Sequence, residues 1–122
     1  MASRVTQLYR GHFLESEGDP VWAIAMRDRL RSKYLRCVVM LGIALERVAH
    51  WEQAANLYRR ALERDNLAEE IYRHLMVCYQ QLGQHAQALE TYQRCRDMLS
   101  ILLGARPSRE TDALNAKIRQ AA

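Results

Sequence analysis

His74 and Cys78 have the residue types and the spacing of a metal-ligand pair. They are four residues apart, which places an imidazole and a thiol on the same face of a helix. A structural zinc site needs four ligands, and the sequence offers no second close pair with convincing spacing. We therefore interpret His74 and Cys78 as packing residues, and we predict no metal site and no cofactor.

A run of basic residues is the second feature that could do chemistry, by contacting phosphate groups. The run comprises Arg27, Arg29, Arg31, Lys33 and Arg36. Nucleic-acid binding favours a broad positive stripe with aromatic platforms, or a helix that enters a groove. Here Asp28 interrupts the run, and Trp22 and Tyr34 belong to the apolar stripe of the same segment. A solvated helix face is the favoured interpretation, docking on an acidic neighbouring domain is an alternative, and we expect no direct contact with nucleic acid.

Catalytic chemistry finds little support in the sequence. The carboxylates are scattered on polar faces, at Glu46, Glu63, Glu69, Glu70 and Glu90. No Ser-His-Asp or Cys-His arrangement follows from spacing, and there is no Gly-rich phosphate loop. We expect no catalytic residues and a function that is not enzymatic.

The composition indicates one soluble domain in a reducing compartment. The chain has 122 residues, 49% apolar and 26% charged, and its formal charge of +4 permits acidic partners without requiring them. Three cysteines without a CxxC pair argue against a disulfide framework. The one continuous apolar run, Cys37 to Leu45, is shorter than the roughly 20 residues that span a bilayer. With no secretory signal either, we predict a cytoplasmic protein.

Two stretches of the chain match at a shift of 34 residues. The matching pairs are Ala54 with Ala88, Tyr58 with Tyr92, Ala61 with Cys95, Ala49 with Gly83, and Leu41 with Leu75. A fixed period of about 34 residues with small, aromatic, small spacing is typical of tetratricopeptide-type helical hairpins. We predict an all-α, tetratricopeptide-like helical hairpin array (an α-α superhelix) with a C-terminal capping helix.

These repeat positions have packing roles in the predicted array. The alanines would lie where two helices approach closely, and a close crossing would also explain Gly42 inside a helix. The tyrosines would fill the wider gap one turn later and keep their hydroxyls near water. Such hairpins bury their apolar faces only against neighbours, so the array presents surfaces to partners.

Turn and cap residues predict where the helices begin and end. Asp19-Pro20 begins a helix that continues to His50, in one piece or with a slight break near Ser32. The second helix is expected over Glu52 to Asp65. The third would begin at an Asn66 cap paired with Glu69 and end at a left-handed stop at Gly83. The fourth would span Ala86 to Leu103 and be closed by Gly104, and the last would follow a Ser108 cap.

Three apolar stripes are expected to face the core. The first consists of Trp22, Met26, Leu30, Tyr34, Val38, Leu41, Leu45 and Val48. The second consists of Ala88, Tyr92, Cys95, Leu99 and Leu102. The third covers the open end of the array and consists of Ala113, Leu114, Ile118 and Ala121.

The predicted organisation has three parts. Residues 1–19 would hold an N-terminal helix remnant and connector, residues 20–104 the helical core, and residues 105–122 the capping helix. Within the core, the repeats would span about residues 35–68 and 69–102.

The order of motifs along the chain resembles the bacterial transcriptional activator domain. LYRGHFL at Leu8–Leu14 is followed by Trp22, the basic helix and the two repeats, and then by LGARPSRET at Leu103–Thr111 and by Leu114. The resemblance covers about Leu8 to Arg119. The two flanking motifs make it far more specific than the repeat alone.

The resemblance implies a tetratricopeptide-like fold used for protein contact or self-association in a transcription regulator. In the activators this module follows a winged-helix DNA-binding domain, and in some large regulators it accompanies a nucleotide-hydrolysing switch domain. Neither is present here, and because the chain begins partway into a helix, we expect an excised domain or the end of a larger protein. The expected partners are other domains of the same regulator, the transcription machinery or a second copy in a homodimer.

The concave face of the array is the candidate binding surface, since the first helix of each hairpin lines it in tetratricopeptide arrays. Its residues would be Arg36, Val39, Ile43, Glu46, Glu70, Arg73, Val77 and Gln80. They could grip a peptide or a helix, although the preceding helix could instead bury Val39 and Ile43. The favoured function is a non-catalytic interaction module that couples a signal to a DNA-binding or switch domain outside the chain. The alternative is a free-standing adaptor that binds a peptide or helix in this groove.

Overall fold

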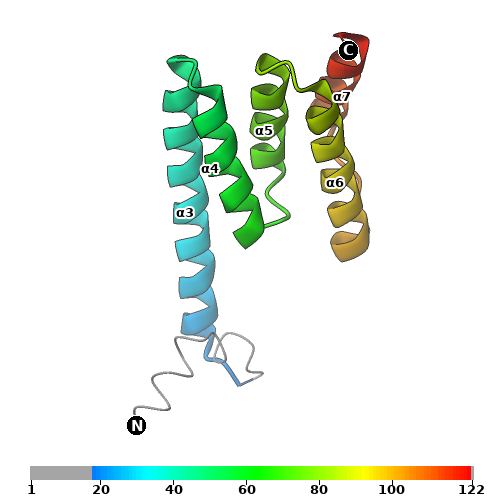
Figure 1. Cartoon of the computed structure of the whole chain (residues 1–122). Coiled ribbons are helices and arrows are strands. Elements are labelled where there is room, and N and C mark those ends of the chain that lie inside the picture. The colour runs from blue at the N-terminus through cyan, green and yellow to red at the C-terminus, as the bar shows by residue number, and fades with distance from the viewer. Residues whose placement is uncertain (1–17, 122) are drawn as a thin grey trace. The chain divides into compact units, whose positions relative to one another are not determined.

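The chain forms helices throughout the part that this computed structural model describes, residues 18–121 (Figure 1). They are α3 (Val21–Arg47), α4 (Trp51–Arg64), α5 (Glu69–Gln81), α6 (His85–Leu103) and α7 (Arg109–Ala121). No strand occurs in that range, and the predicted all-α helical hairpin array is confirmed. The LYRGHFL motif lies outside the described residues, and the three-part division of the chain stays a prediction.

Two compact units make up the chain, residues 1–34 and residues 35–122, and α3 crosses the boundary between them. In the first unit, the Pro20 carbonyl accepts hydrogen bonds from the Ala23 and Ile24 amides at 3.0 and 3.2 Å. The predicted helix start is therefore confirmed. The Asp19 carboxylate, almost fully buried, pairs with Arg27 at 3.0 Å, so this buried charge has its partner.

In the second unit, α5 is the central helix, because it packs against α4, α6 and α7. Its buried side chains are Ile71, Tyr72, Leu75, Met76, Cys78 and Tyr79. Tyr72 forms a core cluster with Cys95 and Leu99 of α6. Short turns join the helices into hairpins, so α5 is covered by its neighbours along both the α4 and the α6 side.

The turns that end α3 and α5 have the same backbone geometry, at the 34-residue shift seen in the sequence. Ala49 and Gly83 both have positive φ, 62° and 74°. The next amide in each turn donates to the carbonyl five residues earlier, from His50 at 2.9 Å and from Gln84 at 2.8 Å. The left-handed stop predicted at Gly83 is confirmed. Gly104, which was predicted to close its helix, and Ala49 also have positive φ.

Gly42 lies at the close helix crossing that its position predicted. It is buried, and a Cβ atom placed on it would overlap the Tyr58 ring of α4. Ala54 and Ala61, on either side of Tyr58 along α4, are fully buried. The Tyr58 hydroxyl, however, is not near water: it is buried and donates a hydrogen bond to Glu46. The prediction for this hydroxyl was wrong because Gly42 leaves room for the whole ring inside the core.

Parts of the predicted apolar stripes are exposed. Leu102 is 52% exposed, because it lies in the last turn of α6, beyond Leu99, the last buried residue of that helix. With 19 residues, α6 is longer than α5, which has 13. On α3, Trp22 and Leu41 are 66% and 54% exposed. The predicted stripe consisted of the largest apolar side chains of the segment. The α3 face that meets α4, however, needs a residue without a side chain at Gly42.

On α7 the buried positions are Thr111 and Ile118, and Leu114 is half-buried. Ala113 and Ala121 are exposed, so the predicted apolar face of this helix is only partly correct. The face that meets α5 and α6 begins with a threonine, which a search for apolar residues passes over.

The predicted cap at Asn66 is wrong. The N-cap position of α5 is Ala68, and no side chain forms a cap hydrogen bond there. The Asp65 carboxylate accepts a bond from the Leu67 amide at 3.1 Å and closes the turn. Glu69, which was expected to complete a capping box, instead accepts hydrogen bonds from residues at the start of α7.

Candidate partner-binding face

The eight residues predicted to bind a partner come from two helices, α3 and α5, and all lie in the second unit. Two of them are exposed, Arg36 and Glu70. The others are half-buried: Val39, Ile43, Glu46, Arg73, Val77 and Gln80. We refer to these eight residues as the α3–α5 face.

A hollow of about 410 Å³ lies between α3 and α5. Arg36, Val39 and Glu70 of the α3–α5 face line it, together with Leu35, Met40, Ala68, Glu69 and Ile71. Met40 is 72% exposed at this hollow. One arginine, two glutamates and apolar side chains thus line one concavity, which suits an apolar side chain of a partner with charged neighbours.

A second hollow, of about 280 Å³, lies between α5 and α7. Arg73 and Val77 of the α3–α5 face line it, with His74, Glu110 and Leu114. The structure therefore distributes five of the eight predicted residues over two hollows and places both hollows beside α5.

Glu46 is occupied by contacts within the protein. The Tyr58 hydroxyl donates to its carboxylate, and the His74 Nδ1 atom lies 2.9 Å from the same oxygen. The Tyr58 and His74 rings stack with their centroids 5.3 Å apart, and the His74 Nε2 atom is 3.9 Å from Glu70. Burial and then the Glu46 carboxylate raise the pKa of Tyr58 far above its ordinary value, so this hydroxyl remains a donor. Glu46 therefore joins α3 to α4 and α5.

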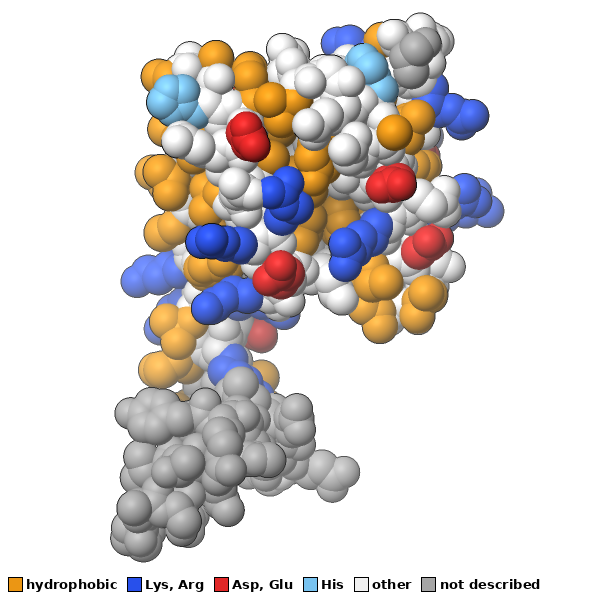
Figure 2. Space-filling model, viewed as in Figure 1, with side chains coloured by type: hydrophobic (Ala, Val, Ile, Leu, Met, Phe, Trp, Pro, Cys, Tyr) orange, Lys and Arg blue, Asp and Glu red, His pale blue; other side chains and the backbone are white. Residues whose placement is uncertain are grey.

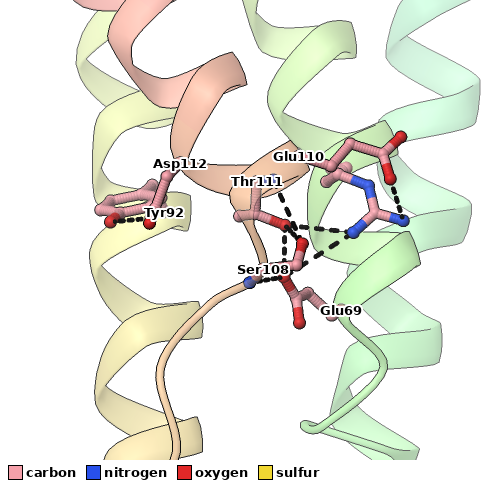
Figure 3. Close-up of polar contacts among 7 residues, drawn as sticks. Glu69, Tyr92, Ser108, Glu110, Thr111 and Asp112 are labelled. Atoms are coloured by element: carbon pink, nitrogen blue, oxygen red, sulfur yellow. Dashed lines mark hydrogen bonds and ion pairs between the residues drawn. The ribbon is translucent and has the colours of Figure 1, made fainter.

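The start of α7 is fastened to α5 through the Glu69 carboxylate (Figure 3). The Ser108 amide and the Thr111 hydroxyl donate to one Glu69 oxygen, at 2.7 and 2.5 Å. Arg73 donates to the Thr111 hydroxyl at 3.1 Å and pairs with Glu110 at 3.5 Å. We call Glu69, Arg73, Ser108 and Thr111 the α7 clip. Arg73 thus supports the fold, whatever else it contacts.

Hydrogen bonding in the α7 clip favours the charged form of Glu69. Burial acts to raise the pKa of this carboxyl, but hydrogen bonds from Thr111 and Ser108 and the nearby Arg73 outweigh it, and the pKa is lowered. The Ser108 hydroxyl also accepts a bond from the Thr111 amide at 3.3 Å, so the predicted Ser108 cap is confirmed.

Sequence reasoning missed the α7 clip, although it used the residues that form it. The PSRET part of the LGARPSRET motif was recognised for the Ser108 cap and for its resemblance to the family. Thr111 in that motif is fully buried and bonds Glu69, which lies 42 positions earlier. The available signal was a threonine inside a specific motif at the first turn of a helix, but its partner could not be read from local spacing.

The other repeat positions differ in burial: Leu75 is buried, whereas Leu41, Ala49 and Gly83 are exposed. Ala88 and Cys95 are fully buried, like Ala54 and Ala61. Tyr92 is half-buried, and its hydroxyl donates to Asp112 of α7 at 2.6 Å.

The chemistry that His74 and Cys78 could supply is limited by their surroundings. His74 contacts Glu46, and burial raises the pKa of the Cys78 thiol to about 12. Burial also raises the pKa of the Cys95 thiol to about 12, so both buried cysteines are protonated at neutral pH. Within residues 18–121 no group of three His, Cys, Asp or Glu side chains is placed to hold a metal ion. In the same range, no helix combines the length and the apolar character that a bilayer span requires.

The architecture is that of an all-helical hairpin module. The family model of the bacterial transcriptional activator domain matches residues 2–119. The chain therefore belongs to the bacterial transcriptional activator domain family, as its motifs indicated. No curated protein and no solved structure matches it.

Proposed function

We propose that this chain is a protein-interaction module of a bacterial transcription regulator and couples a signal to a DNA-binding or switch domain outside the chain. Membership of the family supports a role in transcriptional regulation. The observation that carries the proposal is the hollow between α3 and α5, where Arg36, Val39 and Glu70 combine both charges with apolar surface.

The proposed partner inserts an apolar side chain between α3 and α5. Arg36 and Glu70 would then pair with charges that flank this side chain, which sets the register of the partner. The partner is another domain of the same regulator, a component of the transcription machinery or a second copy of the chain. A free-standing adaptor would use the same hollow for a separate peptide or helix.

Site-specific photo-crosslinking in bacterial cells tests this proposal. A benzoylphenylalanine at Met40, 72% exposed at the α3–α5 hollow, is compared with one at Ile101, 73% exposed on α6. We expect a crosslink from position 40 to a transcription regulator, to RNA polymerase or to a second copy, identified by mass spectrometry. Equal products from both positions, or none from position 40, would argue against this hollow as the binding site.

We further propose that the chain itself does not bind DNA. Arg27 pairs with Asp19 at 3.0 Å and Arg31 lies 3.6 Å from Asp28, so two members of the basic run already have acidic neighbours. On the face that Figure 2 shows, basic, acidic and apolar side chains are interspersed. Salt-dependent binding of a DNA duplex at low ionic strength, lost on replacing Arg29 and Lys33 by glutamine, would contradict this.

We also propose that the chain is a regulatory module that has no active site of its own and acts in the cytoplasm. The raised pKa values of Cys78 and Cys95 support the absence of an active site, because a thiol that stays protonated is a poor nucleophile.

A further inference from the structure

A third hollow, separate from the α3–α5 face, lies between α6 and α7. Its volume is about 370 Å³, and it is lined by Leu89, Tyr92, Gln93, Arg96, Asn115 and Arg119. Arg96 and Gln93 are exposed on α6, and Arg119 is exposed on α7. Both helices belong to the second unit, so two arginines and two side-chain amides from neighbouring helices border one concavity.

Two arginines line this hollow, and no aspartate or glutamate is among its lining residues. The nearest carboxylates, Asp97 and Asp112, keep their charge and accept hydrogen bonds from two lining residues: Gln93 donates to Asp97 at 3.0 Å, and Tyr92 donates to Asp112 at 2.6 Å. Neither arginine forms an ion pair with any residue of the described part of the chain. The Arg96 and Arg119 guanidinium groups are thus available to an anionic ligand.

We propose that this hollow binds an acidic segment of a protein partner, with one carboxylate on Arg96 and another on Arg119. Guanidinium groups match carboxylates in a two-bond geometry, and the amides of Gln93 and Asn115 add neutral donors. The volume is in the lower range of ligand pockets, so it accommodates several side-chain atoms and exceeds what one phosphate ion fills. Leu89 and the Tyr92 ring offer apolar contact for the methylene groups of glutamate.

The proposed site exists only when α7 is docked, because its two arginines come from different helices. The α7 clip fixes the first turn of α7 on α5, and the Tyr92–Asp112 hydrogen bond fixes the same turn on α6. Binding of an acidic segment and docking of α7 therefore support each other. The inference does not depend on the α3–α5 face and stands or fails separately from the proposed function.

A peptide of six glutamates, acetylated and amidated at its ends, is the probe for this site. In NMR titrations of the full chain at low salt, we expect the largest shifts at the Nε–H groups of Arg96 and Arg119 and at the Asn115 side chain. Arg96→Gln and Arg119→Gln should each weaken binding about threefold to tenfold, and the double variant should abolish it. Added salt should weaken binding of the wild-type chain.

Matched controls separate this site from general charge attraction. Lys117→Gln and Arg60→Gln each remove one exposed positive charge outside the hollow. Each control substitution should change the affinity for the glutamate peptide less than twofold, because a single exposed charge away from the site contributes little to binding. Equal losses in all four single variants would overturn the proposal. Tighter binding of inorganic phosphate than of the glutamate peptide would overturn it as well, in favour of a phosphate site.

Discussion

Single residues at helix contacts decide how closely α3 and α4 approach. Gly42 is the clearest case, because the Tyr58 ring occupies the space that any side chain at position 42 would need. The ring is in turn held by its hydrogen bond to Glu46 and by stacking on His74. One glycine thus allows a tyrosine to enter the core, and the tyrosine hydroxyl then anchors a carboxylate.

Gly42→Ala should destabilise the protein by about 1–3 kcal/mol, since the added methyl group overlaps a buried ring. Helix propensity alone predicts the opposite sign, a gain of about 1 kcal/mol. The free energy of unfolding from urea titrations distinguishes the two. A more stable variant would show that the close crossing does not limit position 42.

Ala49 is the one non-glycine residue with positive φ among the described residues, at 62°. The left-handed conformation costs an alanine about 1–2 kcal/mol, whereas glycine adopts it freely. Glycine also raises the conformational entropy of the unfolded chain, which offsets part of this gain. Ala49→Gly should therefore stabilise the protein by about 0.5–1 kcal/mol.

The reciprocal change provides the control for Ala49→Gly. Gly83, at the equivalent turn, has a φ of 74° and open space around a Cβ atom. Gly83→Ala should destabilise by about 1 kcal/mol through backbone strain alone. Thermal unfolding of both variants checks the pair, and two shifts of the same sign would refute the assignment of the turns.

At the scale of elements, the α7 clip determines whether the last helix stays on the array. Glu69→Gln weakens two charge-assisted hydrogen bonds and the attraction to Arg73, so it should cost about 1–3 kcal/mol at pH 7. Hydrogen exchange should accelerate most in α7. Glu63→Gln, at an exposed position of α4, is the matched control.

The same clip predicts how acid affects stability. Because the pKa of Glu69 in the folded protein lies below its ordinary value of 4.5, its ionised form stabilises the fold at pH values above 4.5. This stabilisation is lost as the pH falls through the lowered pKa. The stability difference between the wild-type protein and Glu69→Gln should therefore be full at pH 7 and shrink in acid. A difference that grows as the pH falls would contradict the role of Glu69.

The elements themselves could be predicted from the sequence, because turn residues and hydrophobic periodicity are local signals. Gly104 and Ser108 marked a helix end and a helix start correctly. Glu69 was misassigned because its partners lie 39 and 42 positions further along the chain. Tyr58 was misassigned for a similar reason, since the space for its ring depends on Gly42 in another helix.

At the scale of the molecule, the α3–α5 face illustrates the same limit for function. Periodicity placed its eight residues on two helices, and five of them line hollows. Periodicity could not show that Glu46 and Arg73 are engaged in internal contacts, because His74 and Thr111 approach them from other positions in the chain. The exposed pair, Arg36 and Glu70, therefore carries most of the proposed partner recognition.

The most direct test of the central claim is the transcriptional output of the intact regulator with Arg36→Glu, compared with Arg47→Glu on the same helix. Both arginines are exposed on α3, and only Arg36 lines the α3–α5 hollow. With both variants as stable as the wild-type protein, we predict that Arg36→Glu reduces promoter activity at least several-fold and that Arg47→Glu leaves it unchanged. Equal activity of the two variants would contradict a partner-binding role for the α3–α5 face.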